Sequence, residues 1–269
     1  MKGQPKSTGD IIRLSEASRA DHSEADLLDP SEGTLDLTIF VSCYNESEFI
    51  EGTLDTIHAA LANAPIKYEI IVIDDVSKDN SAELVERYIA THPERRIVLR
   101  RNGVNRGLAQ NYVDASFLGK GKYYRLICGD NAEPLDTITT VFSHMGEADM
   151  LLPYYVTSEG KSGFRQWLSK TYSSLVNIIN GSKIHYYNGL AVHLRYNVMR
   201  WHPTTKGFGF QAEIICMLLA RGATYLEVPV RTVELKGSGS RALTWKNVLS
   251  VSHSLLTIGV RRLSNWVYR

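Results

Sequence analysis

The chain has 269 residues, of which 43% are hydrophobic and 22% charged, a composition typical of one large globular domain or two small ones. Its formal net charge of +1 produces no overall positive field, so the composition does not favour nucleic acid as a partner. The cysteines, Cys43, Cys128 and Cys216, are widely spaced and form neither a zinc-binding pattern nor a disulfide framework, which favours a reducing, cytoplasmic setting.

The chain begins with a polar, acid-rich stretch. Residues 1–35 lack clear periodicity and predict a mobile tail. This stretch lacks the apolar core of a signal peptide. Nowhere does the sequence contain a run of about 18 apolar residues, so we expect no membrane-spanning helix.

Strands and helices alternate through the first half of the chain. Apolar runs at Leu37–Val41 and Ile70–Ile73 predict buried strands, and shorter runs predict two more at Ile97–Leu99 and Tyr123–Cys128. Helical periodicity follows each of the first three strands. The first helix is expected to turn these side chains toward the core: Phe49, Ile50, Leu54, Ile57 and Leu61. The alternation predicts an α/β fold with a single doubly wound, mostly parallel sheet flanked by helices.

The second half of the chain is less regular. Further strands are predicted at Met150–Tyr155, Ala191–Leu194 and Tyr225–Val230. Helices are predicted at Phe164–Ile179, Phe210–Arg221 and Trp245–Trp266. The first and last of these helices mix aromatic and aliphatic residues with Lys and Arg. We therefore expect amphipathic helices that either pack on the core or lie in a membrane interface, and the last helix could also pair two subunits.

Polar and acidic side chains follow three of the predicted strands. These clusters are Tyr44-Asn45-Glu46, Asp74-Asp75 and Asp130-Asn131. The carboxyl ends of parallel strands share one edge of a sheet, where open α/β sheets bind ligands, so the clusters are expected to converge there. Convergent carboxylates suit a divalent metal ion that holds a diphosphate, although such acids can also simply cap a helix. Neither GxxxxGK[ST] nor a GxGxxG after the first strand is present, which disfavours P-loop kinases and dinucleotide dehydrogenases.

Four segments, taken in order, resemble motifs of the family 2 glycosyltransferases, which have the glycosyltransferase-A fold. They are VSCYNE at 41–46, IIVIDDVSKDNS at 70–81, NGVNRG at 102–107 and CGDN at 128–131. Each motif alone is weakly specific, but their shared order and spacing make the resemblance specific over roughly residues 37–135. The resemblance implies a UDP- or GDP-linked sugar as the donor and Mg²⁺ or Mn²⁺ as the cofactor.

The same resemblance implies roles for residues at the strand ends. Tyr44, Glu46 and Asp75 would contact the base and ribose, and Asp130 would bind the metal ion and the diphosphate. The residues expected at the donor site are Ser42, Tyr44, Asn45, Glu46, Asp74, Asp75, Asn105, Gly107, Asp130 and Asn131. Cys128 stands where the family has the first acid of its D-x-D motif, and sulfur is a poor ligand for hard cations. Either Asn131 or Glu133 could complete the metal site, or donor binding could depend less on metal.

Segments of the second half resemble the polyprenyl-phosphate (dolichol-phosphate) sugar synthases. They are NGL at 188–190, GFGFQAEII at 207–215, EVPV at 227–230 and GSGSR at 237–241. A lipid phosphate is already an anion near neutral pH, so it needs cations rather than a strong base. The expected acceptor-binding residues are Arg165, Gln211, Arg231, Lys236, Ser240 and Arg241, and the expected catalytic residues are Asp130, Glu213 and Arg241. Gln211 stands where many members carry Asp, which argues against an acid role at that position.

These observations leave three functions open. The first is an inverting hexosyltransferase that moves a sugar onto a polyprenyl phosphate at the membrane surface. The second uses the same donor with a saccharide or other hydroxyl acceptor in surface-polysaccharide synthesis, which would need a base, and Glu213 is the candidate. The third is a protein that binds a sugar nucleotide without catalysis.

The resemblance also implies a division of the chain. We expect a catalytic domain at 36–242, with a nucleotide-binding half at 36–135 and an acceptor half at 136–242. A C-terminal amphipathic helix at 243–269 would follow. The expected location is the cytoplasm or the cytoplasmic face of a membrane.

Overall fold

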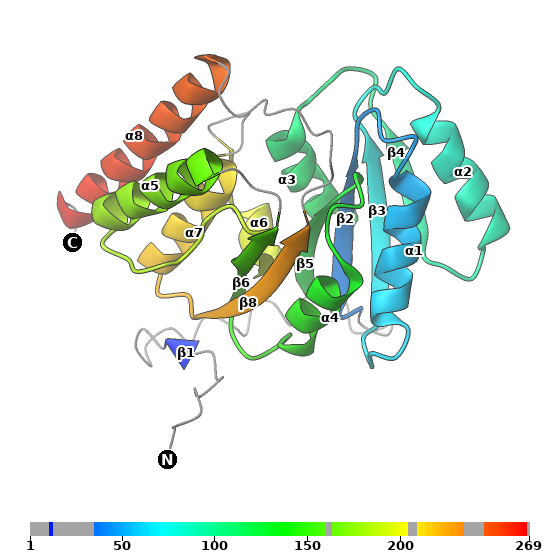
Figure 1. The fold of residues 1–269 in the computed structure, drawn as a ribbon, viewed down its shortest axis with the longest axis horizontal. Coiled ribbons are helices and arrows are strands. Elements are labelled where there is room, and N and C mark those ends of the chain that lie inside the picture. Colours follow the sequence, from blue (N-terminus) through cyan, green and yellow to red (C-terminus); the bar gives the residue numbers. More distant parts are fainter. Residues whose placement is uncertain (1–10, 13–34, 160–162, 204–208, 234–244, 268–269) are drawn as a thin grey trace.

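The computed structural model describes residues 11–12, 35–159, 163–203, 209–233 and 245–267. Within these ranges, eight strands form one sheet in the order β1-β8-β6-β7-β5-β2-β3-β4, with helices on both faces (Figure 1). The predicted single, mostly parallel sheet flanked by helices is therefore confirmed.

The strands from β2 to β5 form the parallel half of the sheet. β2 (Leu37–Cys43) lies between β3 (Tyr68–Asp74) and β5 (Tyr123–Cys128), and β4 (Ile97–Arg101) flanks β3. β2 and β3 are apolar and buried on both faces, as parallel strands covered by helices must be. Cys43 pairs with Asp74 and Ser42 with Cys128, so the three strands end at one edge.

The other half of the sheet mixes strand directions. β6 (Met150–Glu159) pairs in parallel with β8 (Tyr225–Val233), and the short β7 (Val192–Leu194) runs antiparallel between β6 and β5. β1 (Ile11–Ile12) pairs antiparallel with the start of β8, inside the stretch that the sequence predicts as a tail. Residues 1–10 and 13–34 of that stretch lie outside the described residues.

Two hydrophobic cores, one on each face of the sheet, hold the helices in place. One face carries α1 (Ile50–Leu61), α2 (Ser81–Thr91) and α4 (Leu135–Ser143). The other face carries α3 (Leu108–Leu118), α6 (Arg195–Met199) and α7 (Phe210–Ala220). α8 (Trp245–Val267) packs against α7, and α5 (Gly163–Asn180) packs against α8 (Figure 1).

The helices α4 and α6 are not predicted from the sequence, and two of the predicted helices differ from the prediction in detail. α1 buries Ile50, Leu54, Ile57 and Leu61 as expected, but Phe49 is 38% exposed because it precedes the helix as its N-cap. α8 forms where it is predicted, but its amphipathic character is not confirmed, since exposed apolar side chains such as Leu256 and Val260 accompany the buried Ile258. Among the described residues, no helix is long and apolar enough to cross a bilayer.

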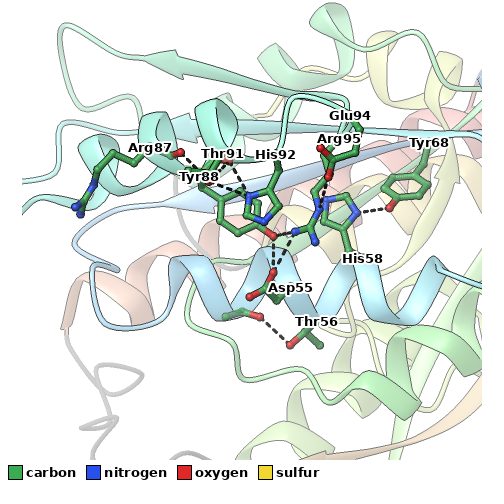
Figure 2. Close-up of polar contacts among 11 residues, drawn as sticks. Asp55, Thr56, His58, Tyr68, Arg87, Tyr88, Thr91, His92, Glu94 and Arg95 are labelled. Atoms are coloured by element: carbon green, nitrogen blue, oxygen red, sulfur yellow. Dashed lines mark hydrogen bonds and ion pairs between the residues drawn. The ribbon is translucent and has the colours of Figure 1, made fainter.

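A polar network joins α1 to the elements around it, as Figure 2 shows. Tyr88 of α2 donates a hydrogen bond of 2.6 Å to Oδ1 of Asp55, and Arg95 donates to the same oxygen at 3.1 Å. His58 is hydrogen-bonded through Nδ1 to the hydroxyl of Tyr68, at the start of β3. This network fixes α1, whose first turn begins at the loop that follows β2.

Candidate active site

Three loops meet at the carboxyl edge of the sheet, after β2, β3 and β5. Among the described residues, the non-glycine residues with positive φ are Asn45 (58°), Val76 (68°) and Asn131 (51°), and each lies in one of these loops. A positive φ is costly for residues with a side chain, above all for a β-branched residue such as Val76. Such backbone strain is typical of functional sites, so these loops form the candidate site.

The loop after β2 is fastened to the loop after β3. Four backbone N–H groups donate to side-chain oxygens across the two loops: Asn45 to Ser77 Oγ at 2.9 Å, Glu46 to Ser81 Oγ at 2.8 Å, Ser47 to Asp79 Oδ2 at 3.2 Å and Lys78 to Asn45 Oδ1 at 2.7 Å. These bonds hold the backbone of the loop, and the Tyr44 side chain is exposed at the edge of the sheet.

The buried carboxylate of Asp75 organises the loop before α3. Its Oδ1 accepts hydrogen bonds from Asn102 Nδ2 and Arg106 N, both at 2.8 Å, and its Oδ2 accepts one from Gly107 N at 2.9 Å. Asn105 Nδ2 donates to the backbone oxygen of Asp75 at 3.0 Å. Burial alone would raise the pKa of Asp75, but these hydrogen bonds outweigh burial and leave the pKa below its ordinary value.

Asp74 and Ser42 lie deeper at the same edge. Asp74 is buried, and its Oδ2 accepts a hydrogen bond from Ser77 N at 3.3 Å, whereas Oδ1 has no hydrogen-bond partner among the described residues. The backbone oxygen of Ser42 accepts a hydrogen bond from Gly129 N at 3.0 Å. This bond joins the ends of β2 and β5.

The turn at Asp130 and Asn131 is held from α1. Thr53 Oγ1 donates to the backbone oxygen of Gly129 at 2.9 Å, and Thr56 Oγ1 donates to Asn131 Oδ1 at 3.1 Å. Asp130 is half-buried, and its Oδ1 accepts one hydrogen bond, from Ala132 N at 3.2 Å. The Asp130 carboxylate is therefore oriented by the turn while part of it stays accessible.

Glu46 and Asp130 interact electrostatically across the junction of two loops. A Cβ at Gly129 would lie 3.3 Å from Glu46 Cγ and 2.5 Å from the backbone oxygen of Ser42, so only glycine permits this approach. Burial, together with the negative charges of Asp130 and Asp79, raises the pKa of Glu46 to about 7. Part of this rise in pKa comes from neighbouring negative charge, which a bound cation would offset.

The side chains at this edge fit a divalent cation that is held jointly by the protein and by a bound substrate. Among the described residues, no group of three His, Cys, Asp or Glu side chains is arranged to hold a metal ion. Burial, and then the charge of Asp130, raises the pKa of Cys128 to about 12, so its thiol stays protonated and is unsuited to ligation. Mg²⁺ commonly binds through one or two carboxylates together with phosphates of the substrate, and Asp130 beside Glu46 fits that mode.

A buried ion pair behind the turn is not expected from the sequence. Arg125 of β5 is 0% exposed and forms an ion pair with Glu133, while its Nε donates to the backbone oxygen of Leu190 at 3.0 Å. Burial raises the pKa of Glu133, and the positive charge of Arg125 opposes that effect. Glu133 is therefore engaged with Arg125. A single Arg within the otherwise apolar strand Tyr123–Cys128 is the signal in the sequence that could have revealed the pair.

The predicted acceptor-side residues are spread over several elements. Glu213 of α7 is 1% exposed and accepts a hydrogen bond of 2.8 Å from Ser254 Oγ of α8. Gln211 is buried on the same helix, and its Oε1 has no hydrogen-bond partner among the described residues. Arg231 is exposed on β8, and its backbone oxygen accepts a hydrogen bond from Thr137 Oγ1 at 2.7 Å. Lys236, Ser240, Arg241 and the side chain of Arg165 lie outside the described residues.

Solved structures share this fold. A mannosyltransferase from Pyrobaculum calidifontis, solved with GDP-Man and Mn²⁺, has a TM-score of 0.60 and 19% identity over 92% of this chain and 78% of that chain. Glucosyl-3-phosphoglycerate synthase from Mycobacterium tuberculosis, in complex with UDP, has a TM-score of 0.63 and 17% identity over 84% of this chain and 80% of that chain. At these identities the likeness establishes the fold alone.

Curated relatives are similar over shorter stretches. Dolichyl-phosphate beta-glucosyltransferase ALG5C of Trichomonas vaginalis is 35% identical over 105 residues, which are 37% of this chain and 30% of the relative. Dolichyl-phosphate beta-glucosyltransferase of Dictyostelium discoideum is 35% identical over 101 residues, 36% of this chain and 31% of the relative. The minor teichoic acid biosynthesis protein GgaA of Bacillus subtilis is 21% identical over 169 residues, 60% of this chain and 37% of the relative.

The matches span about a third of the length of these three relatives. Residues 38–204 match the family described as Glycosyl transferase family 2. This match covers more than half of the chain and includes the three loops at the carboxyl edge of the sheet. The protein therefore belongs to the family 2 glycosyltransferases.

Proposed function

We propose that the protein is an inverting hexosyltransferase that moves a sugar from a nucleoside-diphosphate sugar to a polyprenyl phosphate at a membrane surface. The observation that carries the proposal is the meeting of Glu46, Asp75 and Asp130 in loops at one edge of the sheet. In this proposal, residues 36–242 form the catalytic domain and residues 36–135 its nucleotide-binding half.

The donor would occupy the space between the loops after β2, β3 and β5. The exposed Tyr44 ring and the half-buried Glu46 would contact the base and ribose. Asp75 would act on the donor mainly by holding the Asn102–Gly107 loop, since its carboxylate accepts three hydrogen bonds from that loop. Asn105 and Gly107, as parts of that loop, would lie beside the donor.

The diphosphate would lie at Asp130 and Asn131. Mg²⁺ or Mn²⁺, held by Asp130, would neutralise negative charge that develops on the leaving nucleoside diphosphate. The backbone of the Asp130–Asn131 turn is anchored by Thr53 and Thr56, so the carboxylate would need little rearrangement to bind the cation. Solved structures of similar fold contain GDP-Man and Mn²⁺ or UDP, which supports this assignment without selecting the nucleotide base.

Two observations favour a phosphate as the acceptor. The relatives with 35% identity are dolichyl-phosphate glucosyltransferases. A lipid phosphate is an anion near neutral pH and needs no strong base, which agrees with the burial of Glu213 beneath Ser254. The proposed acceptor-binding residues are Arg165, Gln211, Arg231, Lys236, Ser240 and Arg241.

A saccharide or other hydroxyl acceptor is the second candidate. The similarity to a teichoic acid biosynthesis protein favours it, and Glu213 would then have to act as the base. Binding of a sugar nucleotide without catalysis is the third candidate, and it is favoured by Cys128 at the place of an acid. The proposed location is the cytoplasmic face of a membrane, and the exposed apolar residues of α8 could alternatively pair two subunits.

Product analysis tests the proposal. The purified chain is incubated with Mn²⁺, a UDP- or GDP-linked hexose, and either a short polyprenyl phosphate or free saccharides, and the products are identified by mass spectrometry. We expect a polyprenyl phosphate-linked sugar, and no such product from Asp130→Ala. Exclusive transfer to free saccharides would establish the second candidate. The third candidate, binding without catalysis, would be established if both the native chain and Asp130→Ala bound the donor but neither transferred nor hydrolysed the sugar.

A further inference from the structure

The small net charge of the chain conceals two halves of opposite charge. Residues 1–159 contain 15 Lys and Arg against 26 Asp and Glu, whereas residues 160–269 contain 15 against 3. The sequence has no acid between Glu159 and Glu213, and none after Glu234. α5 and α8 both lie in these acid-free stretches, so the layer that they form carries cations alone. Such an asymmetry between halves points to an anionic partner for the C-terminal half.

A cavity of about 970 Å³ lies between α7, α8 and the segment that follows α5. Its lining includes these cationic side chains: Lys183, Arg200, Arg221, Arg261 and Arg262. Glu213 is the only acid among the described residues that line the cavity, and its buried carboxylate is bonded to Ser254. Apolar side chains, among them Met217, Ile258 and Trp266, form other parts of the wall. The cavity therefore combines positive charge with an apolar surface.

Some of these cations are fixed in place and others are available to a ligand. Arg262 Nη1 donates to the backbone oxygen of Ile179 at 2.7 Å, which joins α8 to the end of α5. Arg200 Nη2 donates to Asn197 Oδ1 at 2.9 Å. The side chains of Lys183 and Arg221 belong to exposed residues and make no hydrogen bond or ion pair with any part of the chain that the structure describes. They are free to bind an anion at the mouth of the cavity.

Exposed apolar side chains lie on the outer surfaces of α8 and α5 beside this cavity. Leu256, Val260, Leu263 and Val267 follow the spacing i, i+4, i+7 and i+11, so they form one exposed stripe along α8. Trp266 is 77% exposed, and Ile178 near the end of α5 is 76% exposed. Two packed helices with an exposed apolar stripe and flanking cations are typical of a surface that lies in a bilayer interface.

We propose that the outer face of α5 and α8 docks on an anionic phospholipid bilayer, with a phospholipid phosphate at the mouth of the cavity between α7 and α8. Charge complementarity selects this partner, because a neutral apolar surface would leave Lys183 and Arg221 without a counter-charge. The proposed phosphate site at Lys183 and Arg221 lies near Tyr225, at the start of β8, whereas Asp130 follows the end of β5, which runs in the same direction as β8. It adds a lipid site to the proposed membrane location and does not depend on sugar transfer.

Vesicle sedimentation tests this proposal with the full chain and without donor or polyprenyl phosphate. One set of vesicles contains only phosphatidylcholine, and the other contains an equal mixture with phosphatidylglycerol. The charge variant is Lys183→Gln/Arg221→Gln, and the apolar variant is Leu263→Gln/Trp266→Gln. The control, Arg87→Gln/Phe117→Gln, removes an exposed cation of α2 and an exposed aromatic ring of α3. Circular dichroism verifies that each variant is folded.

We expect the native chain and the control to bind the anionic vesicles more than about tenfold better than the neutral vesicles, with salt weakening the binding. The charge variant should lose roughly fivefold in affinity for each cation removed, and the apolar variant should bind weakly to both kinds of vesicle. The proposal would be overturned if the native chain bound both kinds of vesicle equally, or if the control variant lost as much affinity as the charge and apolar variants. It would also be overturned if the chain formed a dimer that covers this face and bound no vesicles. Sugar transfer to a short, water-soluble polyprenyl phosphate would persist in that event, so failure here is distinguishable from failure of the proposed reaction.

Discussion

The Gly107 N–H donates a hydrogen bond of 2.9 Å to Oδ2 of Asp75, and this contact ties the start of α3 to the end of β3. Gly107 adopts a φ of 78°, a conformation that favours glycine and that turns its N–H toward the carboxylate. A buried acid thereby sets the shape of a loop at the candidate donor site.

Asp75→Asn tests that relationship. An amide keeps the size of the side chain but places an NH₂ group against backbone N–H donors, so one or two hydrogen bonds are lost. We expect the free energy of unfolding to fall by about 2 kcal/mol and the affinity for a nucleotide sugar to fall with it. Urea unfolding and calorimetry measure the two quantities. Unchanged stability would mean that the three hydrogen bonds do not hold the loop.

Gly129→Ala should disrupt the junction between β2 and β5. The added Cβ would lie 2.5 Å from the backbone oxygen of Ser42, and backbone cannot move aside cheaply. Gly103→Ala is the matched control, because nothing lies within 4 Å of its added Cβ. We expect a loss of about 1–3 kcal/mol in unfolding free energy for Gly129→Ala and a change of less than about 1 kcal/mol for Gly103→Ala. Similar thermal shifts for both variants would argue against a tight approach.

Arg125 and Glu133 should be coupled. Arg125→Met leaves a buried carboxylate without its partner, so the unfolding free energy is expected to fall by about 3–5 kcal/mol. Arg125→Met/Glu133→Gln removes both charges and should recover much of that loss. Chemical denaturation of the single and double variants gives the coupling free energy. Losses that simply add would contradict the buried pair.

His58 should make the fold sensitive to mild acid. Burial, and then the positive charge of Arg95, lowers the pKa of His58 from 6.5 to about 4 in the folded chain (Figure 2). As the pH falls from 6.5 to 4, the unfolded chain binds a proton at this position before the folded chain does, so stability decreases. His58→Gln should flatten the dependence of unfolding free energy on pH within that window. An identical slope in the native chain and the variant would refute this assignment.

The sequence predicts those parts of the site that are determined by short runs of consecutive residues and by the general geometry of parallel sheets. Ile70–Ile73 forms a buried strand because a run of β-branched residues suits a sheet covered on both faces. Asp75 and Asp130 reach one edge because parallel strands align their carboxyl ends.

Other features depend on contacts that the sequence does not encode locally. α4 contains Thr137, Thr139 and Thr140, whose low helix propensity argues against a helix in the sequence. Packing on the hydrophobic core stabilises the helix nevertheless. The pairing of Arg125 with Glu133 requires a turn that brings the two side chains together. β7 runs antiparallel to both β5 and β6, a direction that no residue of Val192–Leu194 specifies.

The central claim is that Asp130 helps to hold a metal-bound diphosphate at the carboxyl edge of the sheet. Calorimetric titration of UDP- and GDP-linked hexoses, with and without Mn²⁺, tests it most directly. We expect Mn²⁺ to tighten donor binding by at least about tenfold in the native chain and in the exposed control Asp136→Asn, but not in Asp130→Asn. Donor binding that is independent of Mn²⁺, or an equal response to Mn²⁺ in Asp130→Asn, would contradict the account.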